Sequence, residues 1–157
     1  MSESISSAEF LNKMVAELVA NGALVDPSWQ AAFKVVPRHL FVPRFYRNDA
    51  KGSTVVDAAF GDEWLAGVYS DIHLVTTADV RSSSTAPSLM ARMLEALELK
   101  GGEKVLEIGT GTGYNTALLS ERLGADRVTS ADIDPDLIAQ AQDRLKRAGY
   151  EPLVEGC

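Results

Sequence analysis

The sequence is poor in the side chains that build disulfides and metal centres. It contains one cysteine, Cys157, so an internal disulfide is impossible. The two histidines, His39 and His73, do not complete a cysteine and histidine ligand set with it. We therefore expect neither a disulfide nor a metal site in this chain.

Basic clusters and long apolar runs are also missing. The 15 lysines and arginines are scattered among 22 acids, and the net charge of −7 disfavours a nucleic-acid partner. No apolar stretch approaches the roughly 18 residues that a membrane span needs, and residues 1–7 lack the basic and apolar regions of a signal peptide. The sequence, 46% hydrophobic and 24% charged, predicts a globular cytoplasmic protein of one domain.

Two amphipathic helices are predicted near the start of the chain. Ser6 and Glu9 have the spacing of a capping box, and apolar residues then recur at helical intervals. Asp26 followed by Pro27 is a second helix start, with its own apolar face. We assign residues 1–50 to an N-terminal helical segment.

The stretch between residues 37 and 84 has no clear period. It collects proline, glycine, asparagine and aspartate, and only 54–56 and 73–75 look extended. Connections of this length in compact domains are usually functional loops or lids. We therefore expect residues 51–86 to form an irregular connection that faces the substrate.

Regular alternation of helices and strands begins at residue 87. The expected helices carry their own start or stop signals, such as the aspartate before Pro135. Alternating β and α elements are typical of a parallel sheet, so the predicted fold class is α/β. The expected order is a helix over 87–98, a strand over 104–108, a helix over 114–123, a strand over 127–131, a helix over 135–148 and an extended segment over 152–154.

The turn after the strand at 104–108 has the composition of a nucleotide-binding turn. Glu107 is followed by Gly109, Gly111 and Gly113, and then by a helix. Glycines reach positive φ without strain and let a ligand approach the free N–H groups at a helix start. This GxGxG spacing differs from the GxGxxG of dinucleotide-binding sheets, and the Gly-Lys-Ser/Thr ending of a P-loop is absent. The alternative is that the three glycines serve only a tight turn.

The acid that follows the next apolar run, Asp132, is expected to bind a ribose diol. It could instead cap the following helix, a role for which Asp134 competes. Together with the glycine turn, Asp132 resembles the S-adenosylmethionine pocket of class I methyltransferases. The resemblance implies S-adenosylmethionine as cofactor, with Glu107 and the three glycines at its amino-acid and ribose end.

A class I methyltransferase sheet has seven strands, and this chain supplies only the first three. Residues 87–157 are therefore expected to form the first half of a Rossmann-like, S-adenosylmethionine-binding domain that follows the helical segment. In the proteins that this chain resembles, later strands lie beside the first strand, here 104–108. We expect that open edge to pair with a second copy of the chain or with a strand from residues 51–84.

Three upstream segments resemble one methyltransferase family in particular. AFKVVPRHLFVP (32–43), YSD (69–71) and SSTAP (83–87) are similar, in this order, to motifs of the protein-L-isoaspartate O-methyltransferases. The resemblance implies a carboxyl O-methyltransferase that acts on isoaspartyl or aspartyl residues of proteins or peptides. Its substrate carboxylate is already ionised at neutral pH, with a pKa of about 4, so methyl transfer needs no general base.

The same resemblance makes Ser83, Ser84 and Thr85 the candidate catalytic residues. Their hydroxyls, with the free N–H groups of the helix that begins at Pro87, are expected to receive the substrate carboxylate. Serine and threonine before a proline-initiated helix are also ordinary N-caps, which is the alternative. The serine-rich sequence is more similar to homologues that methylate aspartates in ribosomally made peptides than to the repair enzyme.

Two other functions stay open. The chain reaches Cys157 near the place where the family has a Gly-Asp-Gly, so Gly156 would match the first glycine and Cys157 would replace the acid that contacts adenine. A truncated methyltransferase fragment without turnover is therefore one alternative. A dinucleotide-binding oxidoreductase is the other, and the glycine spacing disfavours it. Asp71 either touches the substrate or shapes a turn, and both histidines are expected to be structural or solvated.

Overall fold

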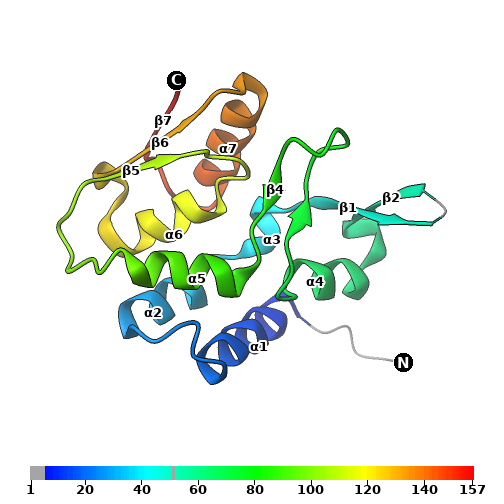
Figure 1. Cartoon of the computed structure of the whole chain (residues 1–157), viewed down its shortest axis with the longest axis horizontal. Helices are drawn as coiled ribbons and strands as arrows, with labels where there is room; N and C mark the ends of the chain where they lie inside the picture. Colours follow the sequence, from blue (N-terminus) through cyan, green and yellow to red (C-terminus); the bar gives the residue numbers. More distant parts are fainter. Residues whose placement is uncertain (1–5, 51) are drawn as a thin grey trace.

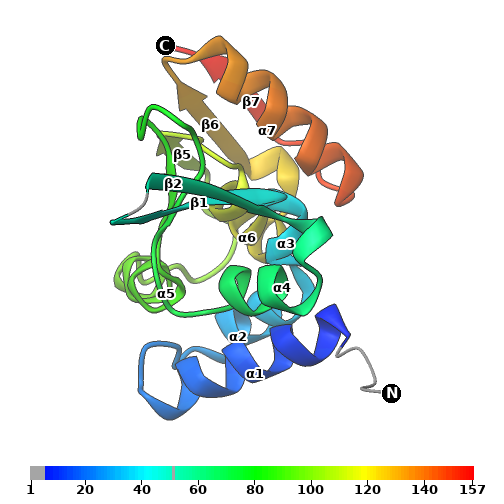
Figure 2. The ribbon, with the colours of Figure 1, turned by 90° about the vertical axis from the view of Figure 1, so that its right-hand side faces the viewer.

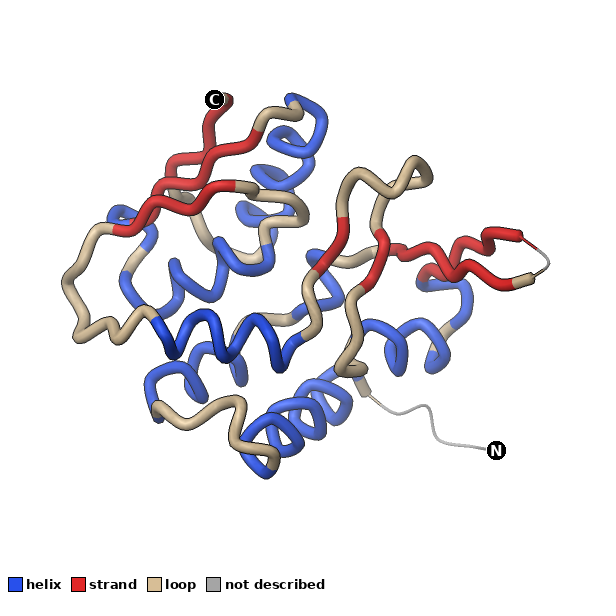
Figure 3. The backbone as a smooth tube through the Cα atoms, viewed as in Figure 1, coloured by secondary structure: helices blue, strands red, loops and turns tan. Residues whose placement is uncertain are grey.

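The computed structural model describes residues 6–50 and 52–157. Helices of the N-terminal half lie at one end of the molecule, and a parallel sheet lies at the other end (Figure 1, Figure 2). A second, antiparallel sheet lies beside the first (Figure 3). Within the described ranges, no helix combines the length and the apolar character that crossing a bilayer requires.

The two predicted N-terminal helices are confirmed. Helix α1 (Ser7–Ala20) begins with a complete capping box, in which the Glu9 N–H donates to Ser6 Oγ at 3.3 Å and the Ser6 N–H donates to Glu9 Oε2 at 2.7 Å. Helix α2 (Pro27–Val35) is capped by Asp26, whose Oδ1 accepts from the Ser28 N–H at 2.7 Å. Both helices bury an apolar face against the rest of the chain.

The predicted parallel sheet is confirmed as an α/β unit. The strands are β5 (Val105–Ile108), β6 (Val128–Asp132) and β7 (Leu153–Gly156), and they lie in the order β5-β6-β7. Helix α6 (Tyr114–Leu123), the turn η2 (Ala125–Arg127) and helix α7 (Pro135–Arg147) connect them. The parallel register pairs Ile108 with Ala131 and Asp132 with Gly156, so the carboxyl ends of all three strands meet at one edge.

The two connecting helices cover only one face of this sheet. Crossovers between parallel strands are right-handed, and both crossovers advance in the same direction, so α6 and α7 lie on the same side (Figure 1, Figure 2). On the other face, Leu106 and Ile108 of β5 are 63% and 71% exposed. The described chain therefore leaves an apolar face of the sheet uncovered.

The expectation of an irregular connection between residues 37 and 84 is wrong. The segment contains helix α3 (Arg38–Phe41), strands β1 (Arg44–Asp49) and β2 (Gly52–Asp57), the turn η1 (Ala58–Phe60), helix α4 (Asp62–Val68), and the two-residue strands β3 (Leu74–Val75) and β4 (Ser83–Ser84). The strands form an antiparallel sheet in the order β2-β1-β3-β4. The predicted extended stretches 54–56 and 73–75 fall within β2 and over β3. The remaining elements are too short to show a hydrophobic period, so they could not be predicted from the sequence.

The expectation that residues 51–84 supply a strand to the open edge at 104–108 is also wrong. Among the described residues, β5 pairs only with β6, and the strands of the 51–84 segment belong to the separate antiparallel sheet. Helix α5 (Pro87–Ala96), predicted over 87–98, lies opposite this edge of β5 and helps to line a cavity there.

Candidate functional site

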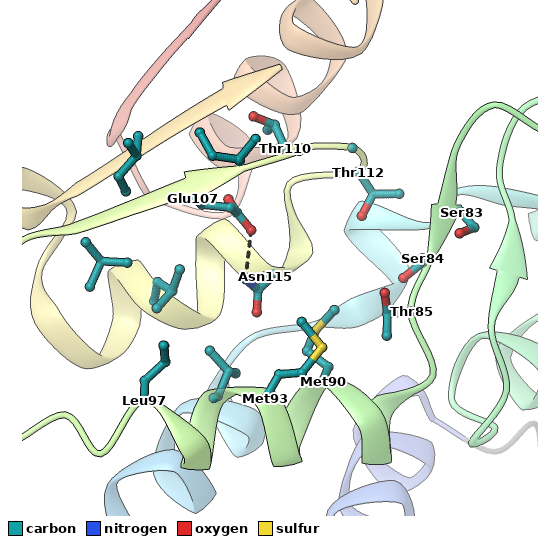
Figure 4. Close-up of a pocket in the computed structure, with 17 residues that line it drawn as sticks. Ser83, Ser84, Thr85, Met90, Met93, Leu97, Glu107, Thr110, Thr112 and Asn115 are labelled. Carbon is teal, nitrogen blue, oxygen red and sulfur yellow. Dashed lines mark hydrogen bonds between the residues drawn. The ribbon is translucent and has the colours of Figure 1, made fainter. Parts of the chain in front are cut away.

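A cavity of about 410 Å³ lies between the glycine turn, the start of α6, strand β4 and helix α5 (Figure 4). Its lining includes the three candidate catalytic residues on one side and three of the predicted cofactor ligands on the other. The cavity then continues between α5 and the free edge of β5, where its walls are apolar. The residues that the structure brings together here are Ser83, Ser84, Thr85, Glu107, Gly109 and Gly111.

The glycines of the turn have different surroundings. Gly109 has a φ of 91°, and a Cβ placed on it would meet no atom within 4 Å, so a ligand can approach its backbone. Gly113 has a φ of 87°, but a Cβ there would lie 3.3 Å from the Cβ of Ala141 in α7. Gly113 thus allows α6 to pack closely on α7, and it does not line the cavity.

Glu107 presents a negative charge at the cavity wall. Its Oε1 accepts from Asn115 Nδ2 at 2.7 Å, and its Oε2 accepts from the hydroxyls of Thr116 and, at 2.6 Å, of Ser130. All three donors are neutral, and no ion pair among the described residues includes Glu107. The carboxylate is therefore held in one orientation without being neutralised, which suits a cationic ligand.

Sequence reasoning missed the three residues that hold Glu107. Thr116 and Ser130 are fully buried, and Thr110 Oγ1 lies 2.6 Å from Ser130 Oγ in the same network. Buried hydroxyls need hydrogen-bond partners. A serine in the middle of the apolar run 128–131 was the signal in the sequence that could have indicated this network.

Asp132 is the last residue of β6 and is joined to the glycine turn. Its Oδ2 accepts from the Gly111 N–H at 2.9 Å, and its Oδ1 accepts from the Asp134 N–H at 3.1 Å. The cap of α7 is Asp134, whose Oδ1 accepts from the Asp136 N–H at 2.9 Å. Asp134, and not Asp132, therefore caps helix α7. The binding of a ribose by Asp132 stays a prediction, because Asp132 is outside the lining of the cavity.

The N-cap alternative for the serine and threonine segment is wrong. No side chain at the start of α5 caps the helix, and Asp71 supplies the cap from a distance, accepting from the Ser88 N–H at 2.8 Å. Neither predicted role of Asp71, contact with the substrate or shaping of a turn, included this cap, and both stay predictions. The cap further means that one of the N–H groups expected to receive a substrate carboxylate already has a carboxylate partner. Hydroxyls of Ser84 and Thr85 remain on the cavity side of this segment (Figure 4).

The histidines lie outside the lining of the cavity. Nδ1 of His39 lies 2.7 Å from the hydroxyl oxygen of Tyr69. Burial lowers the pKa of His39 and raises the pKa of Tyr69 to about 12, so both groups are neutral at pH 7. His73 is exposed. This placement agrees with the expectation that the histidines are structural or solvated.

The fold and the site define a class of protein. A parallel sheet with a Glu-x-Gly-x-Gly-x-Gly turn after its first strand and an acid at the end of the second strand is that of a class I methyltransferase. The model of the protein-L-isoaspartate(D-aspartate) O-methyltransferase family matches residues 9–155. The chain belongs to this family.

Individual relatives agree with this assignment. The chain is 37% identical over 143 residues to protein-L-isoaspartate O-methyltransferase 1 of Archaeoglobus fulgidus, an alignment that covers 90% of this chain and 57% of the relative. It is 32% identical over 139 residues to the enzyme of that name from Ignicoccus hospitalis, with 88% and 56% covered. The chain spans about half the length of the curated relatives it matches.

Solved structures share the fold. A structure described as a protein-L-isoaspartate O-methyltransferase superposes with a TM-score of 0.72 and 31% identity, over 94% of this chain and 41% of that chain. A putative protein-L-isoaspartate O-methyltransferase from Plasmodium falciparum, solved in complex with S-adenosyl-L-homocysteine, superposes with a TM-score of 0.67 over 92% of this chain and 61% of that chain. At 16% identity, the second likeness concerns the fold alone.

Proposed function

We propose that this chain carries the cofactor site and the substrate loop of an S-adenosylmethionine-dependent carboxyl O-methyltransferase for isoaspartyl or aspartyl residues of proteins or peptides. The observation that carries the proposal is the shared cavity, in which the Ser83–Thr85 segment faces Glu107 and the glycine turn. Family membership supports the same reaction. It also disfavours the dinucleotide-binding oxidoreductase.

The cofactor side of the cavity suits a cation that carries a ribose. S-adenosylmethionine, when bound, supplies an electrophilic methyl group on a sulfonium. Glu107 holds an uncompensated negative charge toward the ligand, and Gly109 and Gly111 leave the backbone accessible. Gly113 contributes through helix packing. Each carboxylate oxygen of Asp132 accepts one backbone N–H bond and can accept a further hydrogen bond, and through these free positions Asp132 binds the ribose hydroxyls.

The substrate side positions a carboxylate. Ser83, Ser84 and Thr85 receive it through their hydroxyls, and it attacks without a general base because it is ionised at neutral pH. The contribution of the chain is alignment. Holding nucleophile and methyl donor in line is worth up to about 7–11 kcal/mol in favourable cases.

The three parts of the chain divide this work. In the first part, residues 1–50, helices α1 to α3 form a base, and strand β1 (Arg44–Asp49) departs from the predicted helical segment. Residues 51–86 face the substrate, and residues 87–157 carry the cofactor site. The serine-rich sequence 82–85 favours a dedicated peptide substrate over general protein repair. The composition favours a cytoplasmic protein, and the unpaired edge of β5 favours association of two copies of the chain.

One observation favours a second candidate, a methyltransferase fragment that binds ligand without turnover. The outer edge of β5 has no partner within the described ranges, and the apolar face of its sheet is uncovered, in a chain about half as long as its relatives. We infer that an uncovered sheet face beside the cofactor site would weaken cofactor binding, because nothing in the described chain covers that face.

Turnover by the 157-residue chain separates the two candidates. We expect labelled S-adenosylmethionine to transfer its methyl group to an isoaspartyl or aspartyl peptide as a base-labile ester. Peptides that differ only in the isoaspartyl or normal aspartyl linkage distinguish repair from peptide modification. Calorimetry with S-adenosylhomocysteine tests binding separately. Binding without a labelled ester supports the fragment, and the absence of both refutes the proposed function.

A further inference from the structure

Arg38, in the short helix α3, is a fully buried charged residue that hydrogen-bonds to the segment on the substrate side of the cavity. Its side chain is 0% exposed. One terminal nitrogen, Nη1, donates to the carbonyl oxygens of Val68 at 2.5 Å and Ser70 at 3.3 Å. The other, Nη2, donates to Ser84 Oγ at 3.2 Å and to the carbonyl oxygen of Thr85 at 3.0 Å. The guanidinium thus ties the end of α4 to the segment that faces the cavity.

This charge has no anionic hydrogen-bond partner. Its four acceptors are carbonyl or hydroxyl oxygens, and no ion pair among the described residues includes Arg38. Burial lowers the pKa of Arg38, although nearby tyrosines and Asp71 oppose that shift. A buried charge that no carboxylate hydrogen-bonds costs free energy, so its positive potential is available to an anion that arrives at the adjoining cavity wall.

Arg38 also fixes the direction of one hydroxyl. An arginine can only donate, so Ser84 Oγ is the acceptor in their hydrogen bond. The hydroxyl proton of Ser84 then has to find another acceptor, and the structure gives it none within residues 6–50 and 52–157. Ser84 is 2% exposed and lines the cavity, so its hydroxyl is free to donate to water or to a ligand in the cavity.

The same guanidinium contacts the cofactor side of the site. Its central carbon lies 5.8 Å from the ring centre of Tyr114, the residue that follows Gly113 and begins α6. Arg38 therefore connects the wall that bears Ser84 to the helix that leaves the glycine turn. A change at Arg38 alters how these two walls are placed relative to each other.

We propose that Arg38 is a positioning residue for the substrate carboxylate: it makes the Ser84 hydroxyl a donor toward the cavity and places a positive charge behind that wall. This inference rests on the proposed function, because it takes the ligand of Ser84 to be the carboxylate that is methylated. Arg38 itself does not touch the reacting atoms.

Steady-state methylation of an isoaspartyl peptide by the 157-residue chain and its variants tests the inference. Arg38→Lys keeps a charge but loses the forked pair of donors, and Ser84→Ala removes the hydroxyl. Each is expected to raise the peptide KM about tenfold, the effect of losing a charge-assisted hydrogen bond. The lost contact to the substrate carboxylate is present both in the bound ground state and in the transition state of methyl transfer. Its loss therefore changes kcat by less than it changes KM. Because both changes remove one interaction, the double variant should be no worse than either single variant.

Arg122→Lys is the matched control. Arg122 is a second arginine with a buried side chain, which stacks on Trp29 at 4.3 Å from the ring centre, pairs with Asp26 and is outside the cavity lining. The Arg122→Lys substitution should lower the unfolding midpoint of the chain and leave the peptide KM unchanged. The affinity for S-adenosylhomocysteine should stay within about twofold in the Arg38 and Ser84 variants.

The outcomes separate the two levels of the proposal. An unchanged peptide KM in folded Arg38→Lys and Ser84→Ala variants overturns the role of Arg38 while leaving the proposed function intact. Equal losses of peptide and S-adenosylhomocysteine affinity assign Arg38 to general stability and overturn it too. A wild-type chain that neither binds S-adenosylhomocysteine nor methylates the peptide refutes the proposed function, and the Arg38 inference with it.

Discussion

The backbone N–H of Gly111 donates to Oδ2 of Asp132 at 2.9 Å, which makes the glycine turn and the end of β6 one structural unit. The parallel register of β5 and β6 brings these residues together, because it places Ile108 opposite Ala131 just before them. We therefore expect a change at Asp132 to act on a bound cofactor in two ways, through the carboxylate proposed to bind the ribose and through the shape of the turn that it holds.

Replacement of Asp132 should weaken cofactor binding. Asp132→Ala removes a carboxylate from the proposed ribose site and is expected to cost about 1.5–3 kcal/mol of binding free energy. Calorimetric titration with S-adenosylhomocysteine measures the change. Asp143→Asn, at an exposed acid that pairs with Arg147 on α7, is the control and should bind normally. A folded Asp132→Ala variant with wild-type affinity would remove Asp132 from the site.

Elements with a strong period or a clear cap could be predicted from the sequence. Helix α6 begins and ends where its pattern indicates, and α1 and α2 begin at the capping residues Ser6 and Asp26. The glycine turn between a strand and a helix was recognisable because its glycines, its acid and the flanking strand are contiguous. Local signals of this kind depend on neighbours in the sequence alone.

The environment of Arg38 could not be predicted in this way. Its acceptors lie between 30 and 47 residues further along the chain, so its burial depends entirely on tertiary packing. The same holds for the two-residue strands β3 and β4, because β3 forms by pairing with both β1 and β4, and β4 forms by pairing with β3. The cap of α5 by Asp71 is likewise a contact across 17 residues, which no local pattern reports.

Methylation should not depend on histidine. His39 is paired with Tyr69 and His73 is exposed, and both lie outside the cavity lining, so we expect neither to accept a proton from a bound substrate. We expect His39→Ala and His73→Ala to retain methyl transfer to within a few fold, measured as base-labile ester. Loss of activity in either folded variant, with peptide binding intact, would mean that the base-free mechanism is wrong.

The charge of Asp26 should stabilise the fold in a pH-dependent way. Hydrogen bonding to the Ser28 N–H, with the nearby Arg122 guanidinium 2.9 Å away, lowers the pKa of Asp26 below its ordinary 3.8. A lowered folded-state pKa means that the stabilisation is present above pH 3.8 and is lost as the pH falls through the lower, folded value.

Urea unfolding of wild type and Asp26→Asn between pH 2 and pH 7 measures this contribution. Asparagine is also a good N-cap, so the comparison isolates the charge. Since Asp26 is partly exposed, the difference in unfolding free energy should be about 1 kcal/mol or less at pH 7, and it should shrink toward zero in acid. A difference that is constant across this range would assign the effect to packing.

The unpaired edge of β5 should make the chain associate with itself. A strand edge with free N–H and C=O groups is a template for pairing, and two copies related by a twofold axis would join their β5 strands antiparallel. Leu106→Lys places a charge on this strand and should shift a dimer observed by sedimentation at micromolar concentration toward monomer. Leu89→Lys, at a residue of α5 that is 53% exposed and outside the cavity lining, is the matched control. Amide exchange across 105–108 should be slow in the associated wild type and faster in Leu106→Lys, because the outward-facing N–H groups lose their partners. A wild-type chain that sediments strictly as a monomer, with fast exchange along β5, would exclude pairing through this edge.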